Sequence, residues 1–312
     1  MKDLLRTADL SRADVELLLN TAADFAATPL KANTALANKS VAIYMTKPST
    51  RTRLASETAV AHLGGTPIFI RGDELQLGRG ETIADTARII SGYCDVLIIR
   101  TFAQADVDEL GANASIPVIN GLTDVDHPTQ LLADWVTIRE NFGSDIAGRK
   151  FVYLGDGNNM AQAWLTMGAI MGAHVVAATP SGNWAPDAEV VAQAKAIAAT
   201  TGATIEVTND PEAAAKDASV LYTDVWMSMG DPEAERIEKT KALSPFAVSQ
   251  QLMDLTAKDS IFMHCLPAHR DEEVETSVID GPKSVIWREA FHRRTTIQAI
   301  LYHLTRGELQ GR

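Results

Sequence analysis

The sequence predicts an α/β protein with two doubly wound parallel-sheet domains that carry helices on both faces. Three observations support this fold. Apolar runs rich in β-branched residues alternate with segments of helical period, the alternation occurs in two successive series, and 312 residues suffice for two domains of typical size. We expect the domain boundary in or after the helical segment 129–143, because a turn-rich stretch, residues 144–150, follows it.

Buried strands are predicted wherever a short apolar run lies between helical segments. The first series contains such runs at residues 41–45, 67–70, 96–100 and 117–120. The second series contains them at residues 151–154, 174–179, 204–208, 219–223, 260–264 and 284–287. Near the start, Ser11 and Asp14 have the spacing of a capping box and predict a helix to about residue 26. Near the end, a helical pattern stops at Gly307.

Composition excludes several classes of function. The formal net charge is −12, so the chain lacks the general basic surface that nucleic-acid binding requires. No run of 18 apolar residues predicts a membrane span, and the first residues do not have the pattern of a signal peptide. The two cysteines, Cys94 and Cys265, form no C-x-x-C pair and fit a reducing compartment. We therefore expect a cytoplasmic enzyme.

Hydroxyl and guanidinium groups crowd one predicted strand-to-helix turn, at Ser49, Thr50, Arg51, Thr52 and Arg53. The first N–H groups of a helix have no intrahelical partner and the helix dipole is positive there, so such a turn is typical of an anion site. A capped helix with surface arginines is the alternative, but five consecutive donors favour phosphate binding. The segment lacks the G-x-x-x-x-G-K pattern of a Walker loop.

Two further groups of this half are candidates for the same site. Arg100 ends the run 96–100, and ligands of open α/β sheets bind at the carboxyl ends of strands. A salt-bridged edge residue is the alternative. His127 precedes Pro128, which suits the first position of a helix, and Gln130 shares its face. Both side chains can donate to a carbonyl oxygen, although His127 could equally serve only as a helix cap.

Residues 155–160, GDGNNM, resemble the start of a dinucleotide fingerprint. Met160 stands where the third glycine belongs, and the next predicted strand ends without the acidic residue that would hold a ribose. The fingerprint is therefore a weak indication of NAD binding. Asn158 and Asn159 instead offer amides for the carboxylate or amine of an amino acid.

Asp224 follows the run 219–223 and suits a substrate ammonium group. The following Ser228-Met229-Gly230 predicts a loop that closes over a ligand, with an ordinary βα loop as the alternative.

His264, Cys265 and His269 follow the run 260–264 and allow three interpretations. A structural zinc site would need a fourth ligand, and a Cys–His nucleophile would need a third group to orient it. A backbone carbonyl and a neutral thiol beside an amine substrate fit equally well. In the last helix, Arg293 and Arg294 point to different sides, so at most one of them is expected to meet a ligand.

Four motifs occur in one order: S-T-R-T-R at 49–53, H-P-T-Q at 127–130, D-x-W-x-S-M-G at 224–230 and H-C-L-P at 264–267. Together they resemble the aspartate/ornithine carbamoyltransferase family, over nearly the whole chain. The last two motifs favour its ornithine branch, because a carboxylate and a neutral thiol suit a cationic amino acid. The resemblance implies transfer of the carbamoyl group of carbamoyl phosphate to the δ-amine of L-ornithine, which yields citrulline and phosphate in arginine metabolism.

The resemblance also implies a role for each matching residue. The groups expected to bind the phosphate or surround the carbamoyl group are Ser49, Thr50, Arg51, Thr52, Arg100, His127 and Gln130, with Gln76 reaching the phosphate of a neighbouring subunit. The groups expected to bind ornithine are Asn159, Asp224, Ser228 and Met229. Cys265 and the Leu266 carbonyl would meet the amine and the carbamoyl nitrogen, and Arg293 would complete the site. Of these, the expected catalytic residues are Arg51, Arg100, His127, Cys265 and Arg293.

The same resemblance implies a carbamoyl phosphate-binding domain of residues 1–135 and an ornithine-binding domain of residues 136–291. The C-terminal helix, residues 292–312, would pack back on the first domain. Family members usually carry Glu-Asn before the arginine of this helix, whereas this chain has Phe291-His292, which leaves Arg294 as an alternative to Arg293.

A homotrimer with shared active sites is expected from the resemblance. No metal or cofactor is expected, because carbamoyl phosphate is already activated. Two rivals from other classes stay open: an NAD-dependent oxidoreductase, and a non-catalytic module that binds an amino acid or phosphate.

Overall fold

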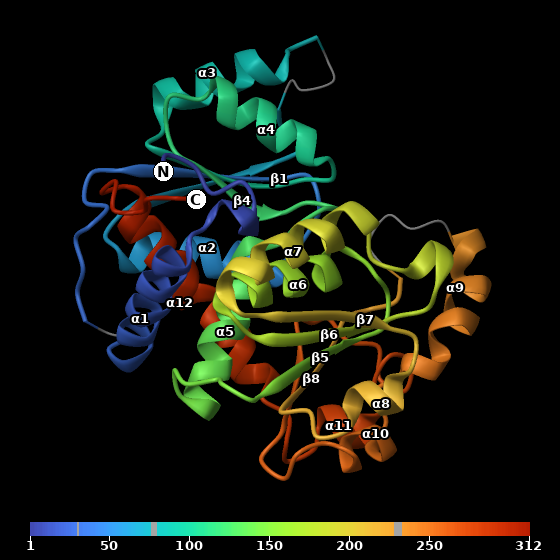
Figure 1. Cartoon of the computed structure of the whole chain (residues 1–312). Coiled ribbons are helices and arrows are strands. Elements are labelled where there is room, and N and C mark those ends of the chain that lie inside the picture. The colour runs from blue at the N-terminus through green and yellow to red at the C-terminus, as the bar shows by residue number, and fades with distance from the viewer. Residues whose placement is uncertain (30, 76–79, 228–232) are drawn as a thin grey trace. The chain divides into compact units, whose positions relative to one another are not determined.

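The computed structural model describes residues 1–29, 31–75, 80–227 and 233–312. Backbone contacts divide the chain into two compact units: unit 1 is Met1–Val136 with Phe291–Arg312, and unit 2 is Thr137–Ala290. Each unit is built on its own parallel sheet with helices on both faces (Figure 1). The predicted α/β fold is therefore confirmed.

Unit 1 contains a four-stranded parallel sheet in the order β2-β1-β3-β4. Its strands are β1 (Ser40–Met45), β2 (Thr66–Arg71), β3 (Val96–Arg100) and β4 (Val118–Leu122). Its helices are η1 (Thr7–Asp9), α1 (Arg12–Ala27), α2 (Thr50–His62), α3 (Ile83–Tyr93), α4 (Gln104–Asn113), the start of α5 (Pro128–Phe142) and most of α12 (Ile286–Leu304). In Figure 1, α3 and α4 cover one face of this sheet, and α2 and α12 lie on the other.

The strand order of unit 1 indicates at which edge of its sheet a ligand would bind. The chain passes from β1 outward to β2 and then returns to β3 on the other side of β1. Crossovers from β1 and from β3 therefore leave the sheet in opposite directions, which opens a crevice beyond their carboxyl ends. Met45 and Arg100 end these two strands and are register partners. The turn into α2 and the guanidinium of Arg100 thus start from the same edge.

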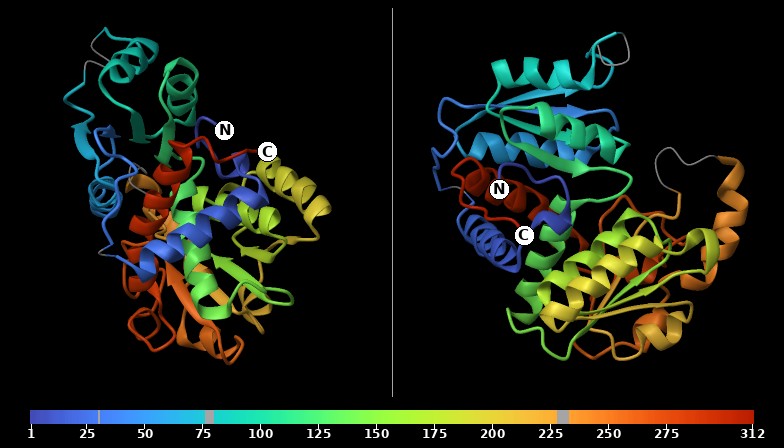
Figure 2. Two further views of the ribbon diagram at one scale, coloured as in Figure 1. Left: turned by 90° about the vertical axis from the view of Figure 1, so that its left-hand side faces the viewer. Right: turned by 45° about the horizontal axis from the view of Figure 1, so that its top comes forward.

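Helix α12 packs back on unit 1, as expected. The rings of Tyr302 and Phe25 of α1 pack edge-on, with 5.9 Å between their centroids. His303 Nε2 lies 2.7 Å from Thr21 Oγ1. The predicted capping box of α1 is present, because Ser11 Oγ accepts from Asp14 N at 3.1 Å and Asp14 Oδ2 accepts from Ser11 N at 3.0 Å. The two chain ends lie side by side in this unit (Figure 2), where Met1 N donates to Leu309 O.

Unit 2 contains a five-stranded parallel sheet in the order β7-β6-β5-β8-β9. Its strands are β5 (Lys150–Leu154), β6 (His174–Ala178), β7 (Thr204–Thr208), β8 (Val220–Thr223) and β9 (Ile261–His264). Its helices are α6 (Asn159–Met171), η2 (Gly182–Trp184), α7 (Ala188–Thr201), α8 (Pro211–Ala215), η3 (Glu233–Glu235), α9 (Arg236–Leu243), η4 (Ser244–Phe246), α10 (Gln250–Asp254) and α11 (Thr276–Ile279). The strand order reverses between β5 and β8, which marks the ligand edge of this sheet.

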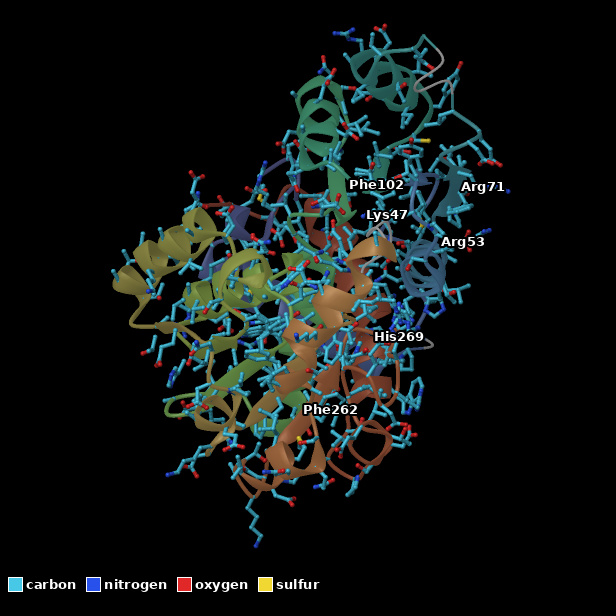
Figure 3. All side chains as sticks on the ribbon, turned by 90° about the vertical axis from the view of Figure 1, so that its right-hand side faces the viewer. Lys47, Arg53, Arg71, Phe102, Phe262 and His269 are labelled. Atoms are coloured by element: carbon cyan, nitrogen blue, oxygen red, sulfur yellow. The ribbon has the colours of Figure 1, made fainter. Side chains whose placement is uncertain are left out.

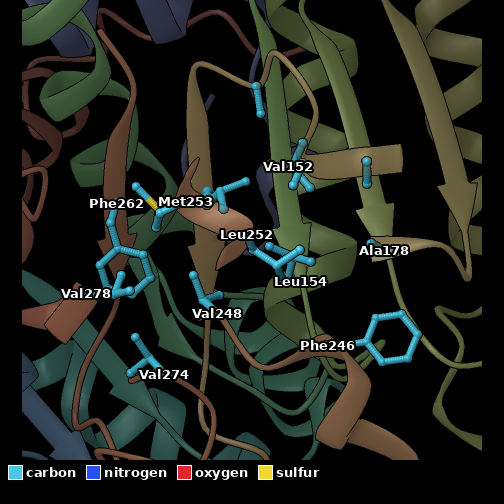
Figure 4. Close-up of a cluster of buried hydrophobic side chains, with 14 of the residues drawn as sticks. Val152, Leu154, Ala178, Phe246, Val248, Leu252, Met253, Phe262, Val274 and Val278 are labelled. Atoms are coloured by element: carbon cyan, nitrogen blue, oxygen red, sulfur yellow. The ribbon is translucent and has the colours of Figure 1, made fainter. Parts of the chain in front are cut away.

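Apolar side chains from the sheet and from α8, α10 and α11 form the core on one face of unit 2 (Figure 4). Val152 and Leu154 of β5 project into it, and Phe262 of β9 packs there with Val278 of α11. All four are at most 3% exposed. Burying a side chain of this size stabilises the fold by about 1.5–3 kcal/mol. This core fixes the strands whose ends carry the polar groups described below.

One predicted strand is wrong. Residues 284–287 do not form a sixth strand of unit 2, because α12 begins at Ile286 and only Ser284 pairs with the sheet, through a single bridge to Phe262. A short apolar run has the same pattern whether it is a buried strand or the start of a buried helix. The wider helical period that continues to Leu304 decides the outcome here.

Within the described part of the chain, no helix combines the length and the apolar composition needed to cross a membrane.

Candidate active site

The turn between β1 and α2 has the geometry of an anion site. Ser49 caps α2, and its Oγ accepts a hydrogen bond from Thr52 N at 3.2 Å. The first turn of α2 therefore presents N–H groups and the positive end of the helix dipole beside two hydroxyl groups. Ser49 and Thr50 also line a cavity of about 710 Å³, as do Arg53 and Arg71. Figure 3 labels these two arginines. The charged groups that line this cavity are Arg53, Arg71 and Asp73, and Arg71 pairs with Asp73 at 2.7 Å.

The two arginines of the motif differ in role. Arg53 is stacked on the ring of Phe69, with 3.7 Å from its guanidinium carbon to the ring centroid, and its Nε donates to Glu57 Oε1 at 3.1 Å. Arg53 therefore braces α2. Arg51 is half-buried, and its charge acts on the buried ring of His127. Arg51 is thus the arginine of the pair that belongs to the cluster around His127.

Thr52 connects the two arginines that come from elsewhere in unit 1. It is 1% exposed, and its Oγ1 accepts from Arg100 Nη1 and from Arg293 Nη2, each at 3.3 Å. A hydroxyl oxygen with two guanidinium donors has little capacity left for a ligand. The structure thus places Thr52 as the group that positions the arginines, and Ser49 and Thr50 closer to the cavity.

Arg293, and not Arg294, joins this cluster. Arg293 is 2% exposed, and its Nη1 donates to Gln130 Oε1 at 2.6 Å while Nη2 also donates to Thr129 Oγ1 at 3.3 Å. Arg294 points elsewhere: its Nη1 is 2.9 Å from His62 Nδ1, and it lies over the ring of Phe291. Of the two adjacent arginines, Arg293 is therefore the one that lies in the cluster.

His127 is a neutral hydrogen-bonding group. It is 4% exposed at the start of α5, and burial lowers the pKa of His127 well below its ordinary value. The charges of Arg293, Arg100 and Arg51 lower this pKa further. Beside it, burial raises the pKa of Asp126 to about 6, although Asp126 Oδ1 accepts from His127 N at 2.7 Å. A neutral imidazole among three guanidinium groups suits the polarisation of a carbonyl oxygen.

Lys47 is a cation that the sequence analysis did not single out. It precedes the anion turn and is 5% exposed. Its Nζ lies 4.0 Å from the ring centroid of Phe102 and forms an ion pair with Asp124 (Lys47 and Phe102 are labelled in Figure 3). Its position at the carboxyl end of β1 is the signal that could have identified it.

In unit 2, three polar side chains meet at the carboxyl edge of neighbouring strands. Asn158 follows β5, Asp224 follows β8 and Cys265 follows β9. Asp224 Oδ2 accepts from Asn158 Nδ2 at 3.2 Å, and Asp224 Oδ1 accepts from Cys265 Sγ at 2.9 Å. Asp224 is 8% exposed, so the structure holds a nearly buried carboxylate at this edge. Such a group favours a cationic partner.

Cys265 is a neutral thiol in this arrangement. Burial raises the pKa of Cys265 well above its ordinary value, and the negative charge of Asp224 raises it further. The imidazole of His264 does not serve it as a base, since His264 Nδ1 accepts from Leu266 N at 2.8 Å and Nε2 is 3.2 Å from Glu273 Oε1. The geometry therefore disfavours the Cys–His nucleophile and agrees with a thiol that contacts an amine.

Two buried carboxylates behind Cys265, Glu273 and Glu289, were also missed by the sequence analysis. Because the Leu266 N–H donates to His264 Nδ1, the proton of this imidazole is on Nε2, where Glu273 accepts it. Glu289 Oε2 accepts from His264 N at 2.9 Å. Leu266 has a φ of 59°, a left-handed conformation that costs energy for a branched residue and that these contacts hold in place. Together they orient the Leu266 carbonyl and the thiol of Cys265.

The glycines of the GDGNNM segment have a packing explanation. A Cβ on Gly157 would lie 2.2 Å from the carbonyl carbon of Ala185, so only glycine fits there. Asn158 caps α6 through its Oδ1, which accepts from Met160 N at 2.9 Å and from Ala161 N at 3.3 Å. Asn159 is the first residue of α6 and is half-buried. The resemblance to a dinucleotide fingerprint thus follows from close backbone packing.

Three expected ligand residues lie outside the described residues: Gln76, Ser228 and Met229. Among the described residues, the possible zinc ligands fall into two separate clusters. Asp224, His264 and Cys265 form one group, and His269 lies in another with Glu272 and Glu273.

Fold and site together define a two-unit α/β enzyme whose first unit has a cationic cradle and whose second unit has a buried carboxylate at its ligand edge. Family models match both halves. The "Aspartate/ornithine carbamoyltransferase, carbamoyl-P binding domain" matches residues 2–140, and the "Aspartate/ornithine carbamoyltransferase, Asp/Orn binding domain" matches residues 147–304. The chain belongs to the aspartate/ornithine carbamoyltransferase family.

Several named relatives are similar along their whole length. The ornithine carbamoyltransferase of Pyrococcus horikoshii is 46% identical and aligns over 99% of this chain and 98% of its own. That of Anoxybacillus flavithermus is 48% identical over 97% of this chain and 96% of its own. The solved ornithine carbamoyltransferase of Pyrococcus furiosus superposes with a TM-score of 0.93 at 46% identity, over 99% of this chain and 98% of that one.

Proposed function

We propose that this chain is an ornithine carbamoyltransferase, which transfers the carbamoyl group of carbamoyl phosphate to the δ-amine of L-ornithine and releases citrulline and phosphate. The observation that carries the proposal is the opposite charge of the two ligand edges. Unit 1 gathers arginines around a helix N-terminus, and unit 2 presents the nearly buried Asp224. The first suits a phosphoryl anion and the second suits a cationic amino acid.

In the unit 1 site, Ser49, Thr50 and the N-terminus of α2 bind the phosphate, together with Arg51 and Arg100. His127 and Arg293 donate to the carbonyl oxygen of the carbamoyl group, where negative charge grows as the amine attacks. Arg293 is fixed for this task by Gln130 and Thr52. Each such donor contributes about 3 kcal/mol to stabilising a developing oxyanion.

In the unit 2 site, Asp224 binds the α-ammonium of ornithine, and Asn159, Ser228 and Met229 bind the rest of the amino acid. Cys265 meets the δ-amine. This amine must be neutral to attack, and a protonated thiol beside it adds no negative charge that would favour the ammonium form. The thiol sulfur and the Leu266 carbonyl are both acceptors for N–H groups.

The chemical step needs no external activation. The δ-nitrogen forms a bond to the carbamoyl carbon, the C–O bond to phosphate breaks, and the phosphate leaves with the bonding electron pair. The surplus proton of the nitrogen goes to the departing phosphate or to water. Arginines and the helix N-terminus neutralise the charge of the leaving group.

We further propose a cytoplasmic homotrimer in which Gln76 of one chain completes the phosphate site of its neighbour. The proposal rests on the resemblance of the segment around Gln76 to the family. Mixing Gln76→Ala chains with Arg51→Ala chains tests it. Shared sites predict that the mixture regains activity after subunit exchange, because some sites then receive both intact residues. Activity no higher than the sum of the two inactive variants would contradict sharing.

A citrulline assay with a panel of acceptors tests the function itself. L-ornithine, putrescine, N-acetylornithine and aspartate are each supplied with carbamoyl phosphate, and citrulline or its analogue and phosphate are measured together. We expect equal amounts of the two products with ornithine, and about 30- to 100-fold lower kcat/KM with N-acetylornithine, which lacks a free α-ammonium group, since a charged hydrogen-bonded pair contributes about 2–3 kcal/mol. Turnover of aspartate at a similar rate would refute the assignment.

A further inference from the structure

A second cluster of polar side chains lies in the turn after the Cys265 segment, within unit 2. His269, Glu272 and Glu273 bring one ligand atom each to within 4.8 Å of one another. His269 Nδ1 is 3.8 Å from Glu272 Oε2 and 3.8 Å from Glu273 Oε2. Two backbone hydrogen bonds close the turn: Glu272 N donates to His269 O at 3.1 Å, and Asp271 N donates to Val274 O at 2.7 Å. The three groups therefore converge without a loop rearrangement.

The buried carboxylate of Glu273 has one oxygen, Oε2, without a hydrogen-bond donor among the described residues. Glu273 is fully buried, and its Oε1 receives the N–H groups of His269 and His264. Its Oε2 accepts no hydrogen bond from any residue that the structure describes, and it faces His269 Nδ1 across a distance too long for one. A buried carboxylate oxygen without a partner is costly, and a bound cation is one of the few things that relieve the cost.

The ligand atoms and the total charge of His269, Glu272 and Glu273 indicate which kind of cation they would bind. One imidazole and two carboxylates supply nitrogen and oxygen ligands with a total charge of −2 when the imidazole is neutral, which balances a divalent ion. Imidazole with carboxylates suits zinc and similar transition metals, whereas calcium and magnesium prefer oxygen ligands alone. Ligands at about 2.1 Å from a tetrahedral zinc ion lie about 3.4 Å apart. The two separations from His269 are 3.8 Å, and all three ligand atoms lie within 4.8 Å of one another, so binding would draw the groups closer together.

We propose that His269, Glu272 and Glu273 bind one zinc-class divalent ion, with water in the fourth position. The site is separate from the substrate groups, since His269 is 47% exposed and belongs to a different cluster from Asp224 and Cys265, to which the reaction is assigned. It nevertheless shares Glu273 with the His264 imidazole that holds the Leu266 turn. An ion there stabilises this turn from behind.

Arg236 is a positively charged neighbour that should weaken metal binding, so its removal should have the opposite effect to removal of a ligand. Arg236 Nη2 donates to both oxygens of Glu272, at 3.3 and 3.4 Å. Its positive charge competes with a metal for this carboxylate. Removing the charge with Arg236→Gln should tighten metal binding, whereas removing a ligand should weaken it.

The experiment is a calorimetric titration of the chelator-treated full chain with Zn²⁺, in wild type and in His269→Ala, Glu272→Gln and Arg236→Gln. The matched control is His174→Ala, which removes another histidine of the same unit that pairs with a single glutamate, Glu206, at 2.8 Å. We expect His269→Ala and Glu272→Gln to lose one equivalent of binding or to weaken it at least 100-fold, since even the loss of a supporting group costs about 10–100-fold in metal affinity. We expect His174→Ala to match wild type and Arg236→Gln to bind more tightly.

A Co²⁺ titration separates this site from the cluster that contains Cys265. A thiolate ligand gives an intense charge-transfer band in the near ultraviolet, and nitrogen and oxygen ligands do not. The proposal predicts one Co²⁺ equivalent without this band, lost in His269→Ala. Zinc stoichiometry and affinity unchanged in His269→Ala, or a cobalt spectrum with the thiolate band for every bound equivalent, would overturn it.

Discussion

Arg293 Nη1 donates to Gln130 Oε1 at 2.6 Å, although 163 positions separate the two residues along the chain. This contact joins the C-terminal helix α12 to the start of α5 within unit 1. The same guanidinium also donates to Thr52 and Thr129, so it is held from several sides. The last helix thus contributes to the unit 1 site as well as to its packing.

The adjacent arginines of α12 offer a matched pair of variants. We predict that Arg293→Lys lowers kcat/KM for carbamoyl phosphate about 100-fold, because a lysine cannot supply the forked donors that reach Gln130, Thr52 and a carbonyl oxygen together. Arg294→Lys should change it less than about threefold, since Arg294 contacts His62 instead. Steady-state kinetics with thermal melting as a folding check would measure this, and equal losses in the two variants would contradict the placement.

His127 should act as a neutral donor across the working pH range. Its lowered pKa means that the imidazole stays uncharged where an ordinary histidine would titrate, at about pH 5.5–7.5. We predict that His127→Asn, which keeps a neutral donor, retains more activity than His127→Ala, by about tenfold or more. The ring resonances of His127 in NMR spectra should also stay constant over that range. A titration of His127 near pH 6.5 would show that neither burial nor the three arginines lower its pKa.

Asp224 should affect the two substrates unequally. We predict that Asp224→Asn raises KM for ornithine about 30-fold or more, because a charged hydrogen bond worth about 2 kcal/mol is lost, and leaves KM for carbamoyl phosphate within about threefold. The control is Asp259→Asn, an exposed aspartate of the same unit that pairs with Arg149 at 3.0 Å. Equal weakening of both substrates would count against Asp224 as an ornithine ligand.

Asp14 should stabilise unit 1 only while it is ionised. Burial would raise its pKa, but hydrogen bonds from Ser11, Gln310 and Gly311 lower the pKa of Asp14 below its ordinary value. A carboxyl that binds its proton less tightly in the folded chain stabilises the fold above the unfolded pKa near 3.9, and this contribution is lost as pH falls through the folded value.

We therefore predict that Asp14→Asn lowers the free energy of unfolding by about 1–2 kcal/mol at pH 7, which corresponds to a decrease in Tm of about 2–4 °C for each kcal/mol. The difference from wild type should shrink below about pH 4. Asp24→Asn, at an exposed position of the same helix, is the control. A difference that stays constant down to pH 2 would exclude the electrostatic explanation.

Local pattern predicted much of the fold and of the site. Nine of the ten expected strands are present, because runs such as 96–100 are buried on both faces and have no other interpretation of similar length. The anion turn at Ser49 was predictable for the same reason, since a strand, a cap and a helix follow one another directly. The run 284–287 failed because its apolar residues belong to a longer helical period.

The remaining features depend on contacts between distant segments. The role of Thr52 as an acceptor for two arginines, the ion pair of Lys47 with Asp124, and the bonds of Glu273 and Glu289 to His264 involve partners that no local pattern specifies. Thr52, Lys47, Glu273 and Glu289 are all buried, and their burial appears only once the chain is folded. Three-dimensional structure was therefore needed to distinguish ligand groups from the groups that position them.

The most direct test of the proposed function is a crystal structure with a bisubstrate analogue that joins a phosphonate to the δ-nitrogen of ornithine. The account predicts the phosphonate at Ser49, Thr50 and the guanidinium groups of Arg51 and Arg100, and the α-ammonium group at Asp224. A phosphonate bound anywhere else, or an ornithine moiety that does not contact Asp224, would contradict it.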